Sequence, residues 1–123
     1  PLIKGEGVTD KLVPFHKLSQ WLTYSLLEPL EEYGITVLNL NRLTGLAEYR
    51  NGGLFIDSGV LELRDPNSAN QFYPPAAHII VEWRALTIAL LDCLAEYTRG
   101  EMNLTAEQFP LAKILEGGTW VRV

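Results

Sequence analysis

The chain has 123 residues, 47% of them apolar and 20% charged, and its formal net charge is −5. This composition excludes a disordered chain and is typical of a single domain, or part of one, over residues 1–123. The acidic balance also disfavours nucleic acid as a partner, because binding it requires a basic face.

Two further features bear on where the protein works. Cys93 is the single cysteine, which excludes an intrachain disulfide and favours a reducing, cytoplasmic compartment. It lies in an apolar run, where cysteines are usually buried and inert. Glu82, Arg84 and Asp92 interrupt the longest apolar stretch, so we expect a globular helix there and no membrane span.

Because the chain begins at Pro1 without a methionine, we expect a fragment of a longer protein.

The first predicted element is a helix over residues 15–32, whose apolar positions follow the spacing of one helix face. These positions are Phe15, Leu18, Leu22, Leu26 and Leu30, with Trp21 widening the face. Pro29 should kink or end the helix, and Gly34 suits the position just after it. Residues 35–41 alternate apolar and polar side chains, which predicts either a strand or an extended connector.

The middle of the chain gives weaker patterns. Residues 46–53, LAEYRNGG, predict one short helical turn that Gly52 and Gly53 stop. Residues 54–65 fit neither the helical nor the strand period, and residues 65–75 have the composition of a loop.

A long helix is predicted from Ala76 to Arg99, with Gly100 after it. Apolar side chains on most of its sides indicate that it is central and largely surrounded. Thr105 and Gln108 have the spacing of a capping box for a last short helix, which Gly117-Gly118 ends. The elements together predict a mainly α fold with at most a short hairpin.

The first candidate site lies in the long helix, where Glu82 and Arg84 stand among apolar residues. Burying an unpaired carboxylate is costly, so Glu82 needs a partner or a cavity. Small residues follow Glu82 at helical spacing and leave room beside it, as a ligand-facing acid would need. The alternative is a structural ion pair, for example with Arg50 or Arg42.

The second candidate site is the segment Glu48-Tyr49-Arg50 with the glycines that follow it, together with Asp57. A carboxylate here could act as a general acid, a base or a stabiliser of an oxocarbenium-like transition state. Two carboxylates held apart in a pocket suit cleavage of a glycosidic bond. The alternative is a surface turn with an ion pair that contributes little stability.

The third candidate site surrounds the start of the first helix, where Lys11, His16, Lys17 and Gln20 lie close in sequence. A helix N-terminus carries free N–H groups and partial positive charge, to which lysines add, so an anion such as phosphate could bind. The alternative is a solvated helix face. His16 by itself is more often a structural residue than a catalyst.

Other sites are not indicated by the sequence. It contains no dinucleotide-binding fingerprint, no phosphate-binding loop and no nucleophile elbow. His16 and His78 lie far apart, so the sequence does not indicate a zinc site. We therefore expect neither a metal ion nor an organic cofactor.

Four long segments resemble one known family over nearly the whole chain. The segments are GEGVTDKLVPFHKLSQWLTYSL, LTGLAEYRNGGLFIDSGVL, VEWRALTIALLD and LAKILEGGTW. The family is a domain of unknown function that includes the fourth protein of the fungal uracil-catabolism pathway, with many bacterial members. Its members are considerably longer, and the resemblance places this chain in their C-terminal part. The final residues 121–123 depart from the family's small, glycine-containing continuation.

Three short segments are also similar, more distantly, to the queuosine salvage proteins, which are nucleotide N-glycosylases with a helical, DNA-glycosylase-like fold. Lys17 and Gln20 match a K-x-x-Q helix. Residues 47–50 match an Ala-Asp-Tyr-Arg segment, with Glu48 in place of aspartate. Residues 82–85 match a helix in which a glutamate shortly precedes Arg-Ala. One extra methylene at Glu48 moves its carboxylate by roughly an ångström, which is enough to alter a reaction geometry.

These resemblances imply a hydrolase that cleaves the C–N bond between ribose and a urea-like group of a small nucleoside or nucleotide derivative. Glu48 would stabilise positive charge or activate water, and Asp57 would be the second catalytic carboxylate. The substrate-binding candidates are Lys11, His16, Lys17, Gln20, Tyr49, Arg50, Glu82, Trp83 and Arg84. The alternative is a non-catalytic fragment with a ligand-binding or structural helical core, which could self-associate through exposed apolar surface.

Overall fold

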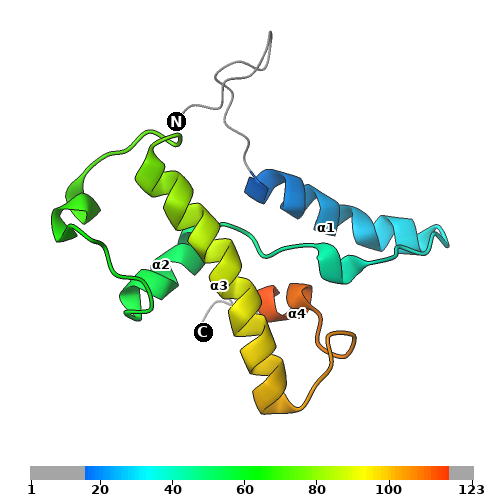
Figure 1. Cartoon of the computed structure of the whole chain (residues 1–123). Helices are drawn as coiled ribbons and strands as arrows, with labels where there is room; N and C mark the ends of the chain where they lie inside the picture. The colour runs from blue at the N-terminus through cyan, green and yellow to red at the C-terminus, as the bar shows by residue number, and fades with distance from the viewer. Residues whose placement is uncertain (1–15, 117–123) are drawn as a thin grey trace, which may run out of the picture.

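A computed structural model describes residues 16–116, and over that range the chain is helical, with no β-strand or hairpin (Figure 1). The elements are α1 (His16–Glu32), η2 (Leu40–Arg42), α2 (Tyr49–Asp57), η3 (Pro66–Asn70), α3 (His78–Met102) and α4 (Leu111–Glu116). The predicted mainly α class is confirmed. Lys11 and the expected break at Gly117-Gly118 lie outside the described residues, and so do residues 121–123.

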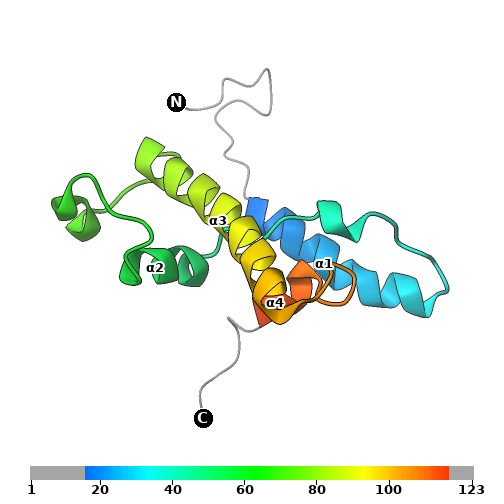
Figure 2. The ribbon, with the colours of Figure 1, turned by 60° about the horizontal axis from the view of Figure 1, so that its bottom comes forward.

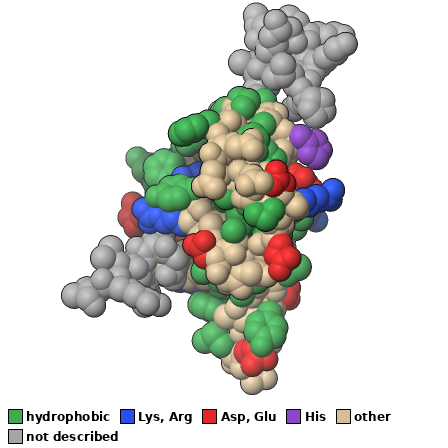
Figure 3. Space-filling view, turned by 90° about the vertical axis from the view of Figure 1, so that its left-hand side faces the viewer, with side chains coloured by type: hydrophobic (Ala, Val, Ile, Leu, Met, Phe, Trp, Pro, Cys, Tyr) green, Lys and Arg blue, Asp and Glu red, His purple; other side chains and the backbone are tan. Residues whose placement is uncertain are grey.

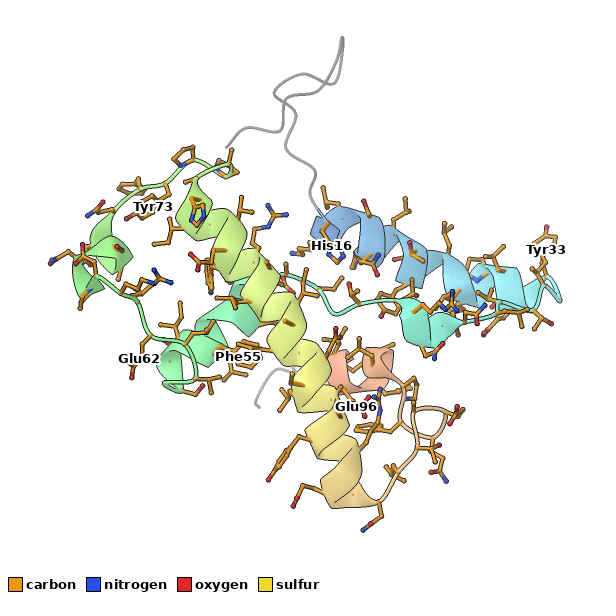
Figure 4. The ribbon with its side chains drawn as sticks, viewed as in Figure 1. His16, Tyr33, Phe55, Glu62, Tyr73 and Glu96 are labelled. Carbon is orange, nitrogen blue, oxygen red and sulfur yellow. The ribbon has the colours of Figure 1, made fainter. Side chains whose placement is uncertain are left out.

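The long helix α3 lies at the centre, with α2 on one side and α1 and α4 toward the other (Figures 1 and 2). The buried side chains of the described part come from α2 and α3: Phe55, Thr87, Leu91 and Ala95. Phe55 lies between these two helices (Figure 4). Because the buried positions of α3 form one stripe, the helix is central but not surrounded. Val81, Leu86 and Tyr97 are exposed, as is Cys93, so the expected buried cysteine is wrong.

Glycine allows α2 to approach α3 closely. A Cβ atom on Gly52 would stand 2.8 Å from the Trp83 indole and 2.8 Å from Thr87 Oγ1. Without that atom, Trp83 Nε1 donates a hydrogen bond to the carbonyl oxygen of Gly52 at 3.2 Å. The expectation that Gly52 and Gly53 stop the helix is therefore wrong. Both lie inside α2, where the helix–helix contact offsets the poor helix propensity of glycine.

The helix α1 is attached by polar side chains. His16, Gln20 and Tyr24 all meet Thr44, in the segment between η2 and α2. None of the residues of α1 is buried. The predicted helix is confirmed over the described residues, but Leu18, Leu22 and Leu26 of its apolar stripe are exposed.

The sequence places two signals for a helix end, Pro29 and Gly34, near the end of α1. Pro29 lies inside α1, which continues to Glu32. Gly34 then adopts φ +77°, and the N–H groups of Gly34 and Ile35 donate to the carbonyls of Glu31 and Leu30, both at 2.9 Å. This is the predicted glycine-terminated helix end. Residues 35–39 form a connector without helix or strand, in which Asn39 adopts φ 60°, so the alternating pattern does not mark a strand.

Two other helix ends differ from the expectation. Helix α3 runs past Gly100 to Met102 and ends at Asn103, which adopts φ 54°. Thr105 and Gln108 do form the two reciprocal hydrogen bonds of a capping box. They close a turn, however, and α4 begins only after Pro110.

We predict opposite effects for alanine at the two adjacent glycines of α2. The Gly52→Ala change should lower the free energy of unfolding by about 1–3 kcal/mol, because the methyl group overlaps Trp83 and Thr87. Gly53→Ala should raise it by about 0.5–1 kcal/mol, since nothing lies within 4 Å and alanine favours the helix. Urea denaturation followed by circular dichroism measures both. Equal effects of the two changes would contradict the close contact.

Candidate functional site

A small pocket lies where α1, the start of α2 and α4 meet, with a volume of about 180 Å³. Its lining residues are Trp21, Tyr24, Leu46, Glu48, Asn51, Ala112, Leu115 and Glu116. This volume is below the roughly 300–1000 Å³ of typical ligand sites, so the pocket suits a small ligand or one part of a larger one.

Glu48 is the half-buried carboxylate of this pocket, and two elements position it. It is the N-cap residue of α2, with an extended backbone, and its side chain makes no capping hydrogen bond. Instead, Oε1 lies 3.0 Å from Nζ of Lys17 on α1. The side chain is therefore directed into the angle between the two helices. A carboxylate held there can stabilise a developing positive charge or accept a proton from water.

Thr44 organises the region next to the pocket. Its backbone N–H donates to Gln20 Oε1 at 3.1 Å, and its carbonyl accepts from the Tyr24 hydroxyl at 3.1 Å. Its hydroxyl lies 3.0 Å from His16 Nε2 and 3.1 Å from the carbonyl of Gly45. A hydroxyl has one proton, so when it donates to Gly45 the imidazole donates to it through Nε2. His16 and Gln20 thus hold α1 in place.

Asp57 is not brought to Glu48, because the two residues flank opposite ends of α2. Nine residues of helix correspond to a rise of about 13 Å, beyond the roughly 5–9.5 Å that separates paired glycosidase carboxylates. The pocket therefore contains one of the two predicted catalytic carboxylates. Glu116 is the second carboxylate among its lining residues.

The residues of α3 lie elsewhere. Glu82 is exposed and lies 3.7 Å from Nδ1 of His78, one turn earlier, so the expectation of a buried carboxylate is wrong. Its partner is neither Arg50 nor Arg42. Trp83 packs on Gly52 instead of lining the pocket, and Arg84 is half-buried on the same helix.

The residues that follow Glu48 are exposed and pair with each other. Arg50 Nε donates to the Tyr49 hydroxyl at 3.2 Å, and its guanidinium lies 5.7 Å from the centre of the Tyr49 ring. This hydrogen bond raises the pKa of Arg50, and the Tyr49 and Glu48 charges add to the effect. Neither side chain lines the pocket.

Several residues that line the pocket are not among those predicted from the sequence. Asn51 follows Glu48 by three residues, so helix periodicity alone places both on one face. Its Nδ2 donates to the carbonyl of Leu46 at 3.0 Å. Tyr24 stands one turn after Gln20 and could have been found in the same way. Nothing local indicates Glu116, because α4 reaches the pocket only through tertiary packing.

Two other features are absent from residues 16–116. No three His, Cys, Asp or Glu side chains of this range come together as a possible metal site. None of its helices is both long and apolar enough to cross a membrane.

Comparison with known proteins shows the family. Residues 2–122 match the family described as "Protein of unknown function (DUF1688)", and the chain belongs to it. No solved structure matches the chain.

Two curated proteins are similar to this chain. It is 50% identical to "Protein urg3" of Schizosaccharomyces pombe over 113 residues, which cover 90% of this chain and 28% of that protein. It is 43% identical to "Uracil catabolism protein 4" of Lachancea kluyveri over 133 aligned positions, which cover 94% of this chain and 30% of that protein. The chain thus spans less than a third of the length of either relative.

We predict that Lys17 and Glu48 are energetically coupled. A double-mutant cycle with Lys17→Met and Glu48→Gln should give a coupling energy of about 0.5–1 kcal/mol, because the pair is partly shielded from water. Urea denaturation at low salt measures the four proteins, and the coupling should shrink at high salt. Additive effects of the two substitutions would show that the ion pair is not formed.

We predict a signature of Tyr24 at alkaline pH. Burial raises the pKa of Tyr24 above its usual value of 10.0, and the nearby Asp92 carboxylate raises it further. Because the folded pKa is the higher one, the stability contributed by the neutral phenol is complete below pH 10. It is lost as the pH rises through the folded pKa. The stability difference between the natural protein and Tyr24→Phe should therefore be constant below pH 10 and diminish above it. A difference that stays flat through this range contradicts the assignment.

Proposed function

We propose that this chain takes part in the catabolism of uracil or a related pyrimidine, and that its pocket contributes to hydrolysis of an N-glycosidic C–N bond. The substrate class is a ribosylurea, with or without a 5′-phosphate. The name of the Lachancea kluyveri relative supports the metabolic role. The distant resemblance to queuosine salvage N-glycosylases, carried by residues 17–20, 47–50 and 82–85, supports the type of bond.

The observation that carries the chemistry is the position of Glu48. Its carboxylate lines a pocket and is oriented by Lys17 at 3.0 Å, across two helices. Cleavage of a ribosyl C–N bond develops positive charge on the sugar ring, which a fixed carboxylate stabilises. The same group can remove a proton from the attacking water.

Other lining residues would bind the substrate. Asn51 uses one amide proton on Leu46, so its Oδ1 can accept a hydrogen bond from a ribose hydroxyl. The Trp21 indole offers a flat surface for the urea group. Because Asp57 and Glu82 lie outside the pocket, we assign the role of second carboxylate to Glu116. Lys17 could contact a phosphate while it keeps its hydrogen bond to Glu48, because its ammonium group has three N–H donors.

A second candidate is a non-catalytic role, in which this chain forms a binding or structural part of a larger site. The small volume of the pocket favours it, because 180 Å³ encloses only part of a nucleotide. Binding of the substrate without turnover by this chain, together with turnover by a full-length relative, would distinguish this role from the first.

We predict that Glu48→Gln lowers urea release from ribosylurea by at least about 100-fold, because the amide neither stabilises positive charge nor accepts a proton. The assay should be run on this chain and on the full-length Schizosaccharomyces pombe relative with the aligned substitution. Glu62→Gln is the matched control, since Glu62 is exposed and lies away from the pocket (Figure 4).

Circular dichroism should show that both variants keep the helical fold. Full activity of the Glu48→Gln form of the relative would refute the catalytic assignment. Equal losses in the Glu62→Gln control would mean that the effect is not specific to the pocket.

A further inference from the structure

The outward face of α1 carries a continuous apolar stripe. Leu18, Leu22 and Leu26 stand one turn apart and are 63%, 56% and 48% exposed. Trp21 lies beside them and is also exposed. Residues at this spacing share one helix face, so the four side chains form a single surface, which we call the α1 face.

An amphipathic helix usually turns its apolar side toward the protein core and its polar side toward solvent. Helix α1 has the opposite orientation. The side that meets the rest of the described chain carries His16, Gln20 and Tyr24, each hydrogen-bonded to Thr44. These specific bonds fix which side faces inward, so the apolar side must face outward. Rotating the helix to bury the leucines would break all three.

This face differs from the opposite side of the molecule. In the view of Figure 3, over η3 and the connection to α3, apolar side chains are scattered among charged and polar ones. Scattered apolar residues are normal on a protein surface, whereas an aligned stripe marks an interface. The aligned leucines of the α1 face therefore give it the character of an interface.

The length of the relatives indicates which partner this is. The matched region covers 28% and 30% of the two relatives, so about 70% of each chain lies outside it. We propose that the α1 face is a docking surface for the polypeptide that corresponds to this unmatched part of the family protein. The last turn of α1 carries Glu31 and Glu32 and no basic residue, so the C-terminal end of the helix is negatively charged. The docked surface is therefore apolar, with lysine or arginine opposite that end.

Docking on this face does not depend on the proposed function, although the two meet at one residue. Trp21 belongs to the α1 face and also lines the pocket that contains Glu48. A polypeptide docked on α1 would lie beside the pocket and could extend its walls.

The test places the same charge on the α1 face in two proteins of different length. Leu22→Asp is made in this chain, and the aligned substitution is made in the full-length Schizosaccharomyces pombe relative. Thermal unfolding should shift by less than about 4 °C in this chain, where Leu22 is exposed. In the relative it should shift by at least about 8 °C, because the charge would be buried. Phe72→Asp is the matched control, since Phe72 is fully exposed and far from α1 in the sequence.

Three results would overturn the proposal. A small shift in both proteins would mean that the face stays exposed in the relative. A large shift in this chain, with sedimentation showing a dimer that the substitution dissociates, would mean that a second copy covers the face. A shift of the same size for the Phe72 control in the relative would mean that the effect is not specific to α1. Since the readout is stability, each result is separate from the urea-release assay.

Discussion

The contact between Gly52 and α3 is the constraint on which the arrangement of the helices depends. The backbone of α2 lies directly against Trp83 and Thr87, where even a methyl group would overlap. Burial of Phe55 stabilises the same pair of helices, and Leu91 of α3 packs against the backbone of Gly45. Since Glu48 is the N-cap residue of α2, this contact also fixes where the carboxylate stands relative to α3.

The second helix pair is held by polar contacts rather than by apolar packing. Thr44 forms hydrogen bonds with His16, Gln20 and Tyr24 of α1. The Lys17–Glu48 ion pair joins α1 to α2. Tyr24, on the polar side of α1, and Trp21, at the edge of its apolar side, both line the pocket. The proposed site and the proposed docking surface therefore adjoin each other on one helix.

Local sequence patterns predicted the helices well, because periodicity and the glycine at residue 34 act over a few residues. They also singled out Lys17 and Glu48, which the fold does bring together at 3.0 Å. The sequence could not show that Glu82 is exposed or that α4 completes the pocket, because both depend on which faces pack. Local sequence predicts that Gly52 ends a helix. It cannot show that the backbone of Gly52 packs closely against Trp83, because that contact is a property of tertiary structure.

The most direct test of this account is titration of the ¹⁵N-labelled chain with ribosylurea, followed by nuclear magnetic resonance. We expect the Trp21 indole and Asn51 side-chain amide signals to shift, because both residues line the Glu48 pocket. The Trp83 indole should be unaffected, since it is bonded to Gly52 outside the pocket. No change at Trp21 and Asn51, or shifts centred on Trp83, would contradict the assignment of this pocket as the substrate site.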